Sequence, residues 1–93
     1  MDDSMYKVVL EVKNVKGECA AKYKVGDRIV VEEPYIISSE SSNICIYALN
    51  ALTPYLTVLY RDTSKSDWIN YIEELQCPDP INTVTFKITR IKI

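Results

Sequence analysis

Histidine is absent from the 93-residue chain, and glycine occurs only twice, as Gly17 and Gly26. Without histidine, the usual activation of a cysteine nucleophile by an imidazole base is excluded. Two isolated glycines cannot build the glycine-rich loop that cradles phosphate groups in P-loop and dinucleotide-binding proteins. These absences argue against an enzyme, and no residue is nominated as catalytic.

The chain also lacks long hydrophobic runs and clusters of basic residues. No stretch approaches the ~18 apolar residues of a membrane span, and the acidic start Met1-Asp2-Asp3 is unlike a signal peptide. The eleven Lys and Arg residues are scattered in a chain of net charge −2, whereas nucleic-acid binders usually carry a basic stripe. We therefore expect a cytoplasmic protein with neither a membrane nor a nucleic acid as its partner.

The composition is that of a globular protein, 47% hydrophobic, and its clearest patterns are those of β-strands. Alternation of apolar and polar residues predicts strands near 5–13 and 83–91. A continuous apolar run predicts a third strand near 28–33, which must end before Pro34 because proline has no ladder donor. The apolar phase changes after Arg90, which predicts a β-bulge there.

A helical block is predicted near 44–61, with Ser42 or Asn43 as its N-cap. Pro54 falls inside the block, and the block is therefore expected to be kinked or broken there. The segment 67–75 fits both a helical and a strand pattern, and the helix is favoured. Strands on both sides of a helical block predict an α+β fold with a small, mainly antiparallel sheet covered by helix.

The length of the chain fits one domain with a single modest core. Residues 1–4 are expected to form a disordered tail, and residues 5–93 a single α+β domain. Internal repeats are absent from the sequence. The domain is therefore expected to fold as one unit.

Three cysteines, Cys19, Cys45 and Cys77, are the one feature with clear chemical potential. Their odd number excludes a complete disulfide framework and fits a reducing compartment. Structural zinc sites usually take four ligands delivered as close pairs, whereas the gaps here are 26 and 32 residues. A zinc or iron–sulfur site would need a fourth ligand from Asp27, Asp79, a carbonyl, water or another subunit. The plain alternative is three small buried apolar residues and no cofactor.

A set of short segments, specific in combination, spans roughly residues 6–91. They are Val15–Cys19, Tyr23–Asp27, Glu33-Pro34, Ile44-Cys45, Ala48-Leu49, Leu52–Tyr55, Cys77–Asp79 and Val84-x-Phe86. In this pattern the chain resembles a family of small uncharacterised prokaryotic domains, single or in tandem repeats, largely from anaerobic bacteria and archaea. The resemblance implies no known activity, but it implies that the three cysteine positions are typical and favours a shared thiol role.

The resemblance also marks a departure from the family pattern. Relatives often carry proline after the first cysteine and proline or histidine shortly after the second, where this chain has Ala20, Ile46 and Tyr47. If that histidine is a ligand in relatives, its absence here weakens a metal site. The family's tandem repeats imply that a single unit dimerises to mimic the pair.

We therefore predict a non-catalytic interaction or scaffolding module that binds itself as a homodimer, or binds another protein. Seven tyrosines suit such an interface, because each has an apolar ring and a polar tip. The alternative is a thiolate-based metal or redox site built from Cys19, Cys45 and Cys77, which requires their sulfur atoms to converge. A third hypothesis is a thiol enzyme using Cys45, because the first turn of a helix favours a thiolate.

Overall fold

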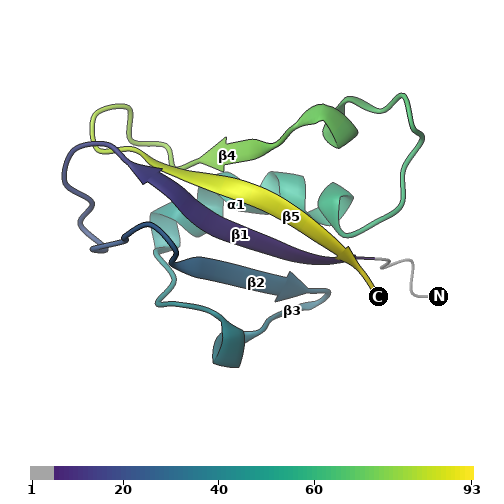
Figure 1. Cartoon of the computed structure of the whole chain (residues 1–93), viewed down its shortest axis with the longest axis horizontal. Helices are drawn as coiled ribbons and strands as arrows, with labels where there is room; N and C mark the ends of the chain where they lie inside the picture. Colours follow the sequence, from purple (N-terminus) through teal and green to yellow (C-terminus); the bar gives the residue numbers. More distant parts are fainter. Residues whose placement is uncertain (1–5) are drawn as a thin grey trace.

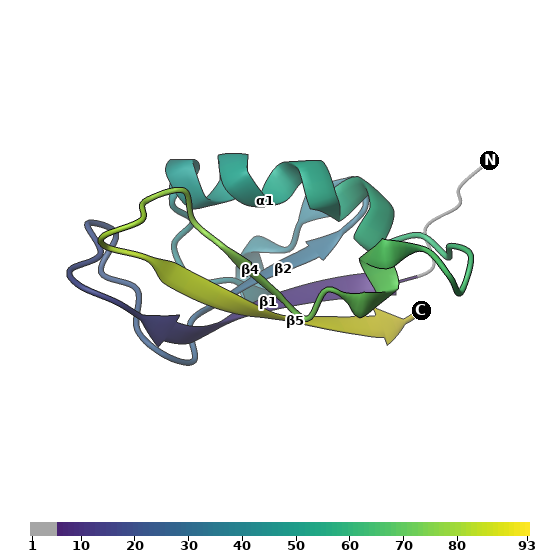
Figure 2. The same cartoon turned by 90° about the horizontal axis from the view of Figure 1, so that it is seen from above.

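The computed structural model describes residues 6–93, and the predicted tail at 1–4 lies outside the described residues. A five-stranded antiparallel sheet, in the order β3-β2-β1-β5-β4, is covered on one face by a single long helix, α1 (Figures 1 and 2). The predicted α+β fold is confirmed. The strands are β1 (Tyr6–Val15), β2 (Arg28–Glu32), β3 (Tyr35–Ile36), β4 (Glu74–Gln76) and β5 (Val84–Lys92); the helices are α1 (Ile46–Leu59) and the 3-10 turns η1 (Ser38–Glu40) and η2 (Trp68–Tyr71).

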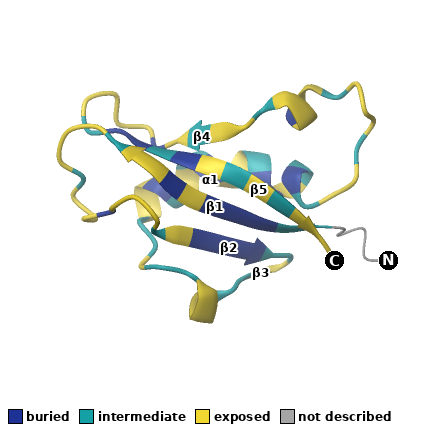
Figure 3. Ribbon diagram, viewed as in Figure 1, coloured by how far each residue is buried: buried dark blue, intermediate teal, exposed yellow. Residues whose placement is uncertain are grey.

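The hydrophobic core lies between α1 and the sheet face beneath it. On the strands, alternate residues point into this layer, and on α1 the inward residues recur at helical spacing. Figure 3 shows this burial along the middle of β1 and β2, with exposed loops at both ends of the sheet. The core side chains with at most 1% exposure are Val8, Leu10, Val12, Ile29, Ala48, Leu52, Leu59, Ile69, Val84 and Phe86.

Strand β5 pairs with β1 in continuous register from Phe86 to Lys92, so the bulge predicted near Arg90 is wrong. The irregularity lies on β1 instead, between Val12 and Asn14. Arg90 has the same phase as the inward residues of β5, and its guanidinium donates to the Leu59 carbonyl at 2.7 Å, at the end of α1. A charged residue therefore takes an inward position because the exposed helix carbonyls there need donors.

The predicted helical block is one helix, and Pro54 lies within it without dividing it. Thr53, the residue before this proline, lies inside the helix, and its hydroxyl donates to the Leu49 carbonyl one turn earlier. The N-cap is Cys45, so the prediction of Ser42 or Asn43 is also wrong. The hydroxyl of Ser42 instead accepts the Arg28 N–H at the start of β2.

The helix predicted over 67–75 is wrong for the second half of that segment. Only Trp68–Tyr71 forms a 3-10 turn, which the Asp67 carboxylate caps by accepting the Ile69 N–H at 3.0 Å. Glu74–Gln76 then forms β4 along β5. No helix among residues 6–93 is long and apolar enough to cross a membrane.

Candidate functional site: a cysteine-lined pocket

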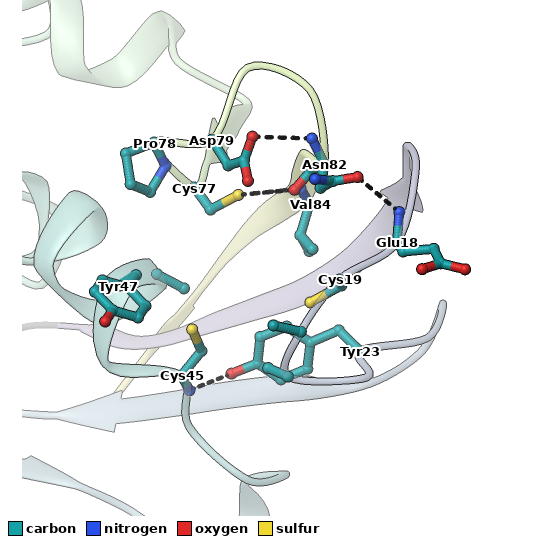
Figure 4. Close-up of a pocket in the computed structure, with 13 residues that line it drawn as sticks. Glu18, Cys19, Tyr23, Cys45, Tyr47, Cys77, Pro78, Asp79, Asn82 and Val84 are labelled. Carbon is teal, nitrogen blue, oxygen red and sulfur yellow. Dashed lines mark hydrogen bonds between the residues drawn. The ribbon is translucent and has the colours of Figure 1, made fainter.

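A pocket of about 360 Å³ opens at one end of the sheet, and all three cysteines line it (Figure 4). Cys19 comes from the β1–β2 loop, Cys45 from the start of α1, and Cys77 from the β4–β5 loop. We call this site the cysteine pocket, defined by Cys19, Cys45, Cys77 and Tyr23. All three cysteines are free.

The sheet topology explains why these distant segments meet. Strands β1 and β4 are both antiparallel to β5, so they run in the same direction and end on the same side of the molecule. The loops that follow them, 16–27 and 77–83, therefore share that end with the start of α1, at the left in Figures 1 and 2. Cysteines separated by 26 and 32 residues thus reach one site.

Cys19 is half-buried on a loop that packs closely against the β4–β5 loop. Gly17 has a φ of 76°, and a Cβ added to it would lie 2.9 Å from the Ile81 carbonyl oxygen. The next residue, Glu18, donates its N–H to the side-chain oxygen of Asn82 at 2.9 Å. Only glycine allows this approach without strain, so Gly17 sets the distance between the two loops that carry Cys19 and Cys77.

Cys45 is half-buried and is positioned by a tyrosine at the floor of the pocket. The Tyr23 hydroxyl accepts the Cys45 backbone N–H at 2.8 Å. The side chain of Cys45, the N-cap residue, makes no capping hydrogen bond of its own. The Tyr23 ring packs edge-on against Phe86, with centroids 5.8 Å apart. Burial raises the pKa of Tyr23 above its ordinary value of 10.0, so this hydroxyl stays neutral at physiological pH.

Cys77 is buried, and both hydrogen-bonding functions of its thiol are used. Its Sγ accepts the Val84 N–H at 3.2 Å and donates to the Asn82 carbonyl at 3.8 Å. Backbone bonds close the same loop, because the Cys77 N–H donates to the Val84 carbonyl at 3.1 Å. Cys77 is therefore the most firmly placed sulfur of the three.

Asp79 orders the loop that carries Cys77. Its carboxylate accepts the N–H groups of Ile81 and Asn82 at 2.9 and 3.0 Å, and these bonds hold its pKa below the ordinary value of 3.8. The charged residues lining the pocket are Asp79 and Glu18, and neither lysine nor arginine is among the lining residues. The pocket therefore favours a neutral or cationic occupant over an anion.

The sequence-predicted metal ligands share one pocket, but they do not form a compact ligand set. Within residues 6–93, no three Cys, Asp or Glu side chains lie close enough together to hold one metal ion. Of the two suggested fourth ligands, Asp79 lines the pocket and Asp27 does not. The Asp27 carboxylate instead accepts the Lys24 N–H at 3.0 Å in its own turn.

Two residues that shape the site, Tyr23 and Asn82, carry no chemical signal in the sequence. Tyr23 bonds to a residue 22 positions away, and Asn82 links the two loops across 64 positions. Comparison of the chain with protein-family models, curated proteins and solved structures finds no match. The family resemblance described above therefore stays a prediction.

Proposed function

We propose that the protein binds a metal centre through the thiolates of Cys19, Cys45 and Cys77. The observation that carries this proposal is that all the cysteines of the chain, from three separate segments, line one pocket. Cysteines that serve only as small apolar residues have no reason to share a site. The presence of all three cysteines in one pocket argues against the alternative in which they are only small buried apolar residues.

The surroundings of the sulfurs support thiolate coordination. The Val84 N–H donates to the Cys77 Sγ, as backbone N–H groups do to metal-bound cysteine sulfur. Cys45 is the N-cap of the 14-residue helix α1, where the exposed N–H groups of the first turn favour an anion. The acidic residues Glu18 and Asp79 at the pocket add a cation-attracting field. A soft cation suits this combination, because thiolate sulfur is a soft ligand.

A thiol enzyme fits the pocket less well. A nucleophilic cysteine needs a neighbouring base or cation to hold the thiolate and to move its proton. The chain has no histidine, and the residues lining the pocket include neither lysine nor arginine. The pocket offers thiol ligands for a metal, but neither an imidazole nor a cationic side chain that would hold a thiolate nucleophile.

Metal analysis of protein purified without oxygen tests this proposal. We expect a fixed metal content per chain that falls to background in Cys19→Ser and Cys45→Ser. The matched control is Ala20→Ser, which adds a hydroxyl to an exposed residue at the same pocket and leaves every thiol in place. A folded wild-type protein that neither retains nor takes up a thiophilic metal contradicts the proposal, and so does equal metal retention in the cysteine variants.

A homodimeric interaction module is a second candidate, and the apolar side chains around the pocket support it. Ile46, Tyr47 and Ile81 are 66%, 67% and 72% exposed, and Tyr47 lines the pocket. Sedimentation over a range of concentrations tests self-association. We expect Tyr47→Ser to weaken a dimer and Tyr35→Ser, also exposed but outside the cysteine pocket, to leave it unchanged. A wild-type chain that stays monomeric at all concentrations rejects this candidate.

A further inference from the structure

The number and spacing of the ligands in the cysteine pocket suggest what kind of metal centre it holds. Structural zinc takes four protein ligands in a tight tetrahedron, with Zn–S bonds of about 2.3 Å. This chain offers three sulfurs, and no three Cys, Asp or Glu side chains among residues 6–93 are close enough to share one ion. A mononuclear centre would therefore require the pocket to contract.

Contraction is opposed by the bonds that hold the pocket walls. Cys77 is fixed through its sulfur to both Asn82 and Val84. The buried Tyr23 side chain lines the pocket, and its hydroxyl accepts the Cys45 N–H. The three cysteines come from separate segments and stand around the pocket, which favours a larger body that bridges them over a single ion.

A cubane of four irons and four sulfides is such a body. Its irons lie at alternate corners of a cube, so its cysteine ligands stand further apart than ligands of a single ion. The pocket volume of about 360 Å³ exceeds the needs of one ion. Backbone N–H bonds to ligand sulfur, like that from Val84 to Cys77, are among the features that tune iron–sulfur clusters.

We infer that the metal centre is a [4Fe–4S] cluster held by Cys19, Cys45 and Cys77, with its fourth iron lacking a cysteine ligand; this inference rests on the proposed function. The chain has no fourth cysteine and no histidine to complete the set. Of the two carboxylates of the pocket, that of Asp79 accepts two backbone N–H groups through its Oδ1 atom, and that of Glu18 points away from the sulfurs in Figure 4. The open iron makes the cluster a binding site for a small ligand.

Reconstitution tests the inference with the full chain, ferric iron, sulfide and an excess of a small thiol under anaerobic conditions. As the cluster assembles, two of its four ferric ions take up one electron each, and two thiols supply these electrons and leave as one disulfide and two protons. Each cysteine replaces one small thiol on a preformed cluster, and its proton leaves with that thiol, so three cysteines release three thiols. We expect about four irons and four sulfides per chain with visible charge-transfer absorption. Mild oxidation should release the open iron and give the paramagnetic signal of a three-iron cluster.

The variants give the inference its sharpest test. Cys19→Ser and Cys45→Ser change half-buried residues and should fold, yet each should lose the wild-type cluster, whereas Ala20→Ser should keep it. Circular dichroism checks the fold of each variant. Because Cys77 is buried, Cys77→Ser can lose the cluster by unfolding, so only a folded Cys77→Ser protein counts as a test of ligation.

Three other outcomes are distinguishable. Stoichiometric zinc binding through the cysteines, with no sulfide retained, overturns the cluster and leaves the proposed metal function standing. A cluster with four cysteine ligands from two chains, or one that resists loss of iron, also overturns the open-site assignment. A folded protein that binds neither zinc nor a cluster overturns both proposals.

Discussion

Replacing Tyr23 by phenylalanine removes one oxygen atom from the floor of the cysteine pocket. The ring can keep its edge-on contact with Phe86, while the Cys45 N–H loses the acceptor that lies 2.8 Å away. An unsatisfied buried donor costs about 1–3 kcal/mol. Because Cys45 is half-buried beside the pocket, water reaches this group in part, so we expect a loss of about 1–2 kcal/mol in the free energy of unfolding.

Urea unfolding followed by circular dichroism measures this loss. The midpoint should fall with an unchanged slope, because the substitution alters an interaction and not the surface exposed on unfolding. In a domain of this size the change corresponds to a melting temperature lower by about 5–15 °C. Tyr35→Phe is the matched control, since Tyr35 is 68% exposed and should tolerate the same change within about 0.5 kcal/mol.

The pH dependence of the stability of the wild type and of Tyr23→Phe gives an independent check. Burial raises the pKa of Tyr23 in the folded protein, so the unfolded chain releases this proton first as the pH rises through 10.0. Wild-type stability therefore falls above that pH, and the component due to Tyr23 is absent from Tyr23→Phe. The stability gap between the two proteins should narrow above pH 10.0. A Tyr23→Phe protein as stable as the Tyr35→Phe control at neutral pH refutes the capping role.

Three further substitutions probe the scaffold of the pocket and the end of α1. Gly17→Ala should destabilise the fold by about 1–3 kcal/mol in urea unfolding, because its φ of 76° disfavours a side chain and its Cβ would meet the Ile81 carbonyl; a neutral effect would show that the loops separate freely. Arg90→Lys should lose about 1–3 kcal/mol, since a lysine cannot reproduce the fork that bonds the Leu59 and Arg61 carbonyls, and a Tm equal to wild type would rule this out. The lowered pKa of Asp79 adds stability that is present above its ordinary value of 3.8 and lost as the pH falls through the folded value, so Asp79→Asn should flatten the acid limb of the stability profile; an unchanged limb contradicts this.

The strongest local patterns predicted the centre of the fold. The alternation around Leu10 and Phe86 placed the two long strands, and Pro34 marked the end of β2. Alternation is a useful guide here because one face of β1 and of β5 packs against α1, although the middle of β1 and β2 is buried on both faces. The phase change after Arg90 misled the prediction, because it marks the end of the core and a charged residue that serves the end of α1, and not a bulge.

The helix was harder to predict, because tertiary packing outweighs local propensity. A proline inside a helix costs about 3 kcal/mol, yet Leu52, Leu56 and Leu59 on both sides of Pro54 are buried against the sheet. Burying each leucine contributes about 1.5–3 kcal/mol, which exceeds the cost of the proline. The N-cap was missed because its hydrogen-bond acceptor, Tyr23, comes from a distant loop and not from the local serines.

The meeting of the three cysteines depended on β4, a strand of three residues that local pattern did not resolve. A helix over 67–75 leaves the direction of the chain before Cys77 undefined, so its sulfur has no predictable position. Once Glu74–Gln76 is paired antiparallel to β5, residue 77 must begin a hairpin loop, and that loop must lie at the same end as the β1–β2 loop with Cys19. The segment that local pattern left ambiguous, 67–75, thus decides whether the three cysteine sulfurs share one site. Binding sites are commonly built from loops that a rigid sheet positions, as here.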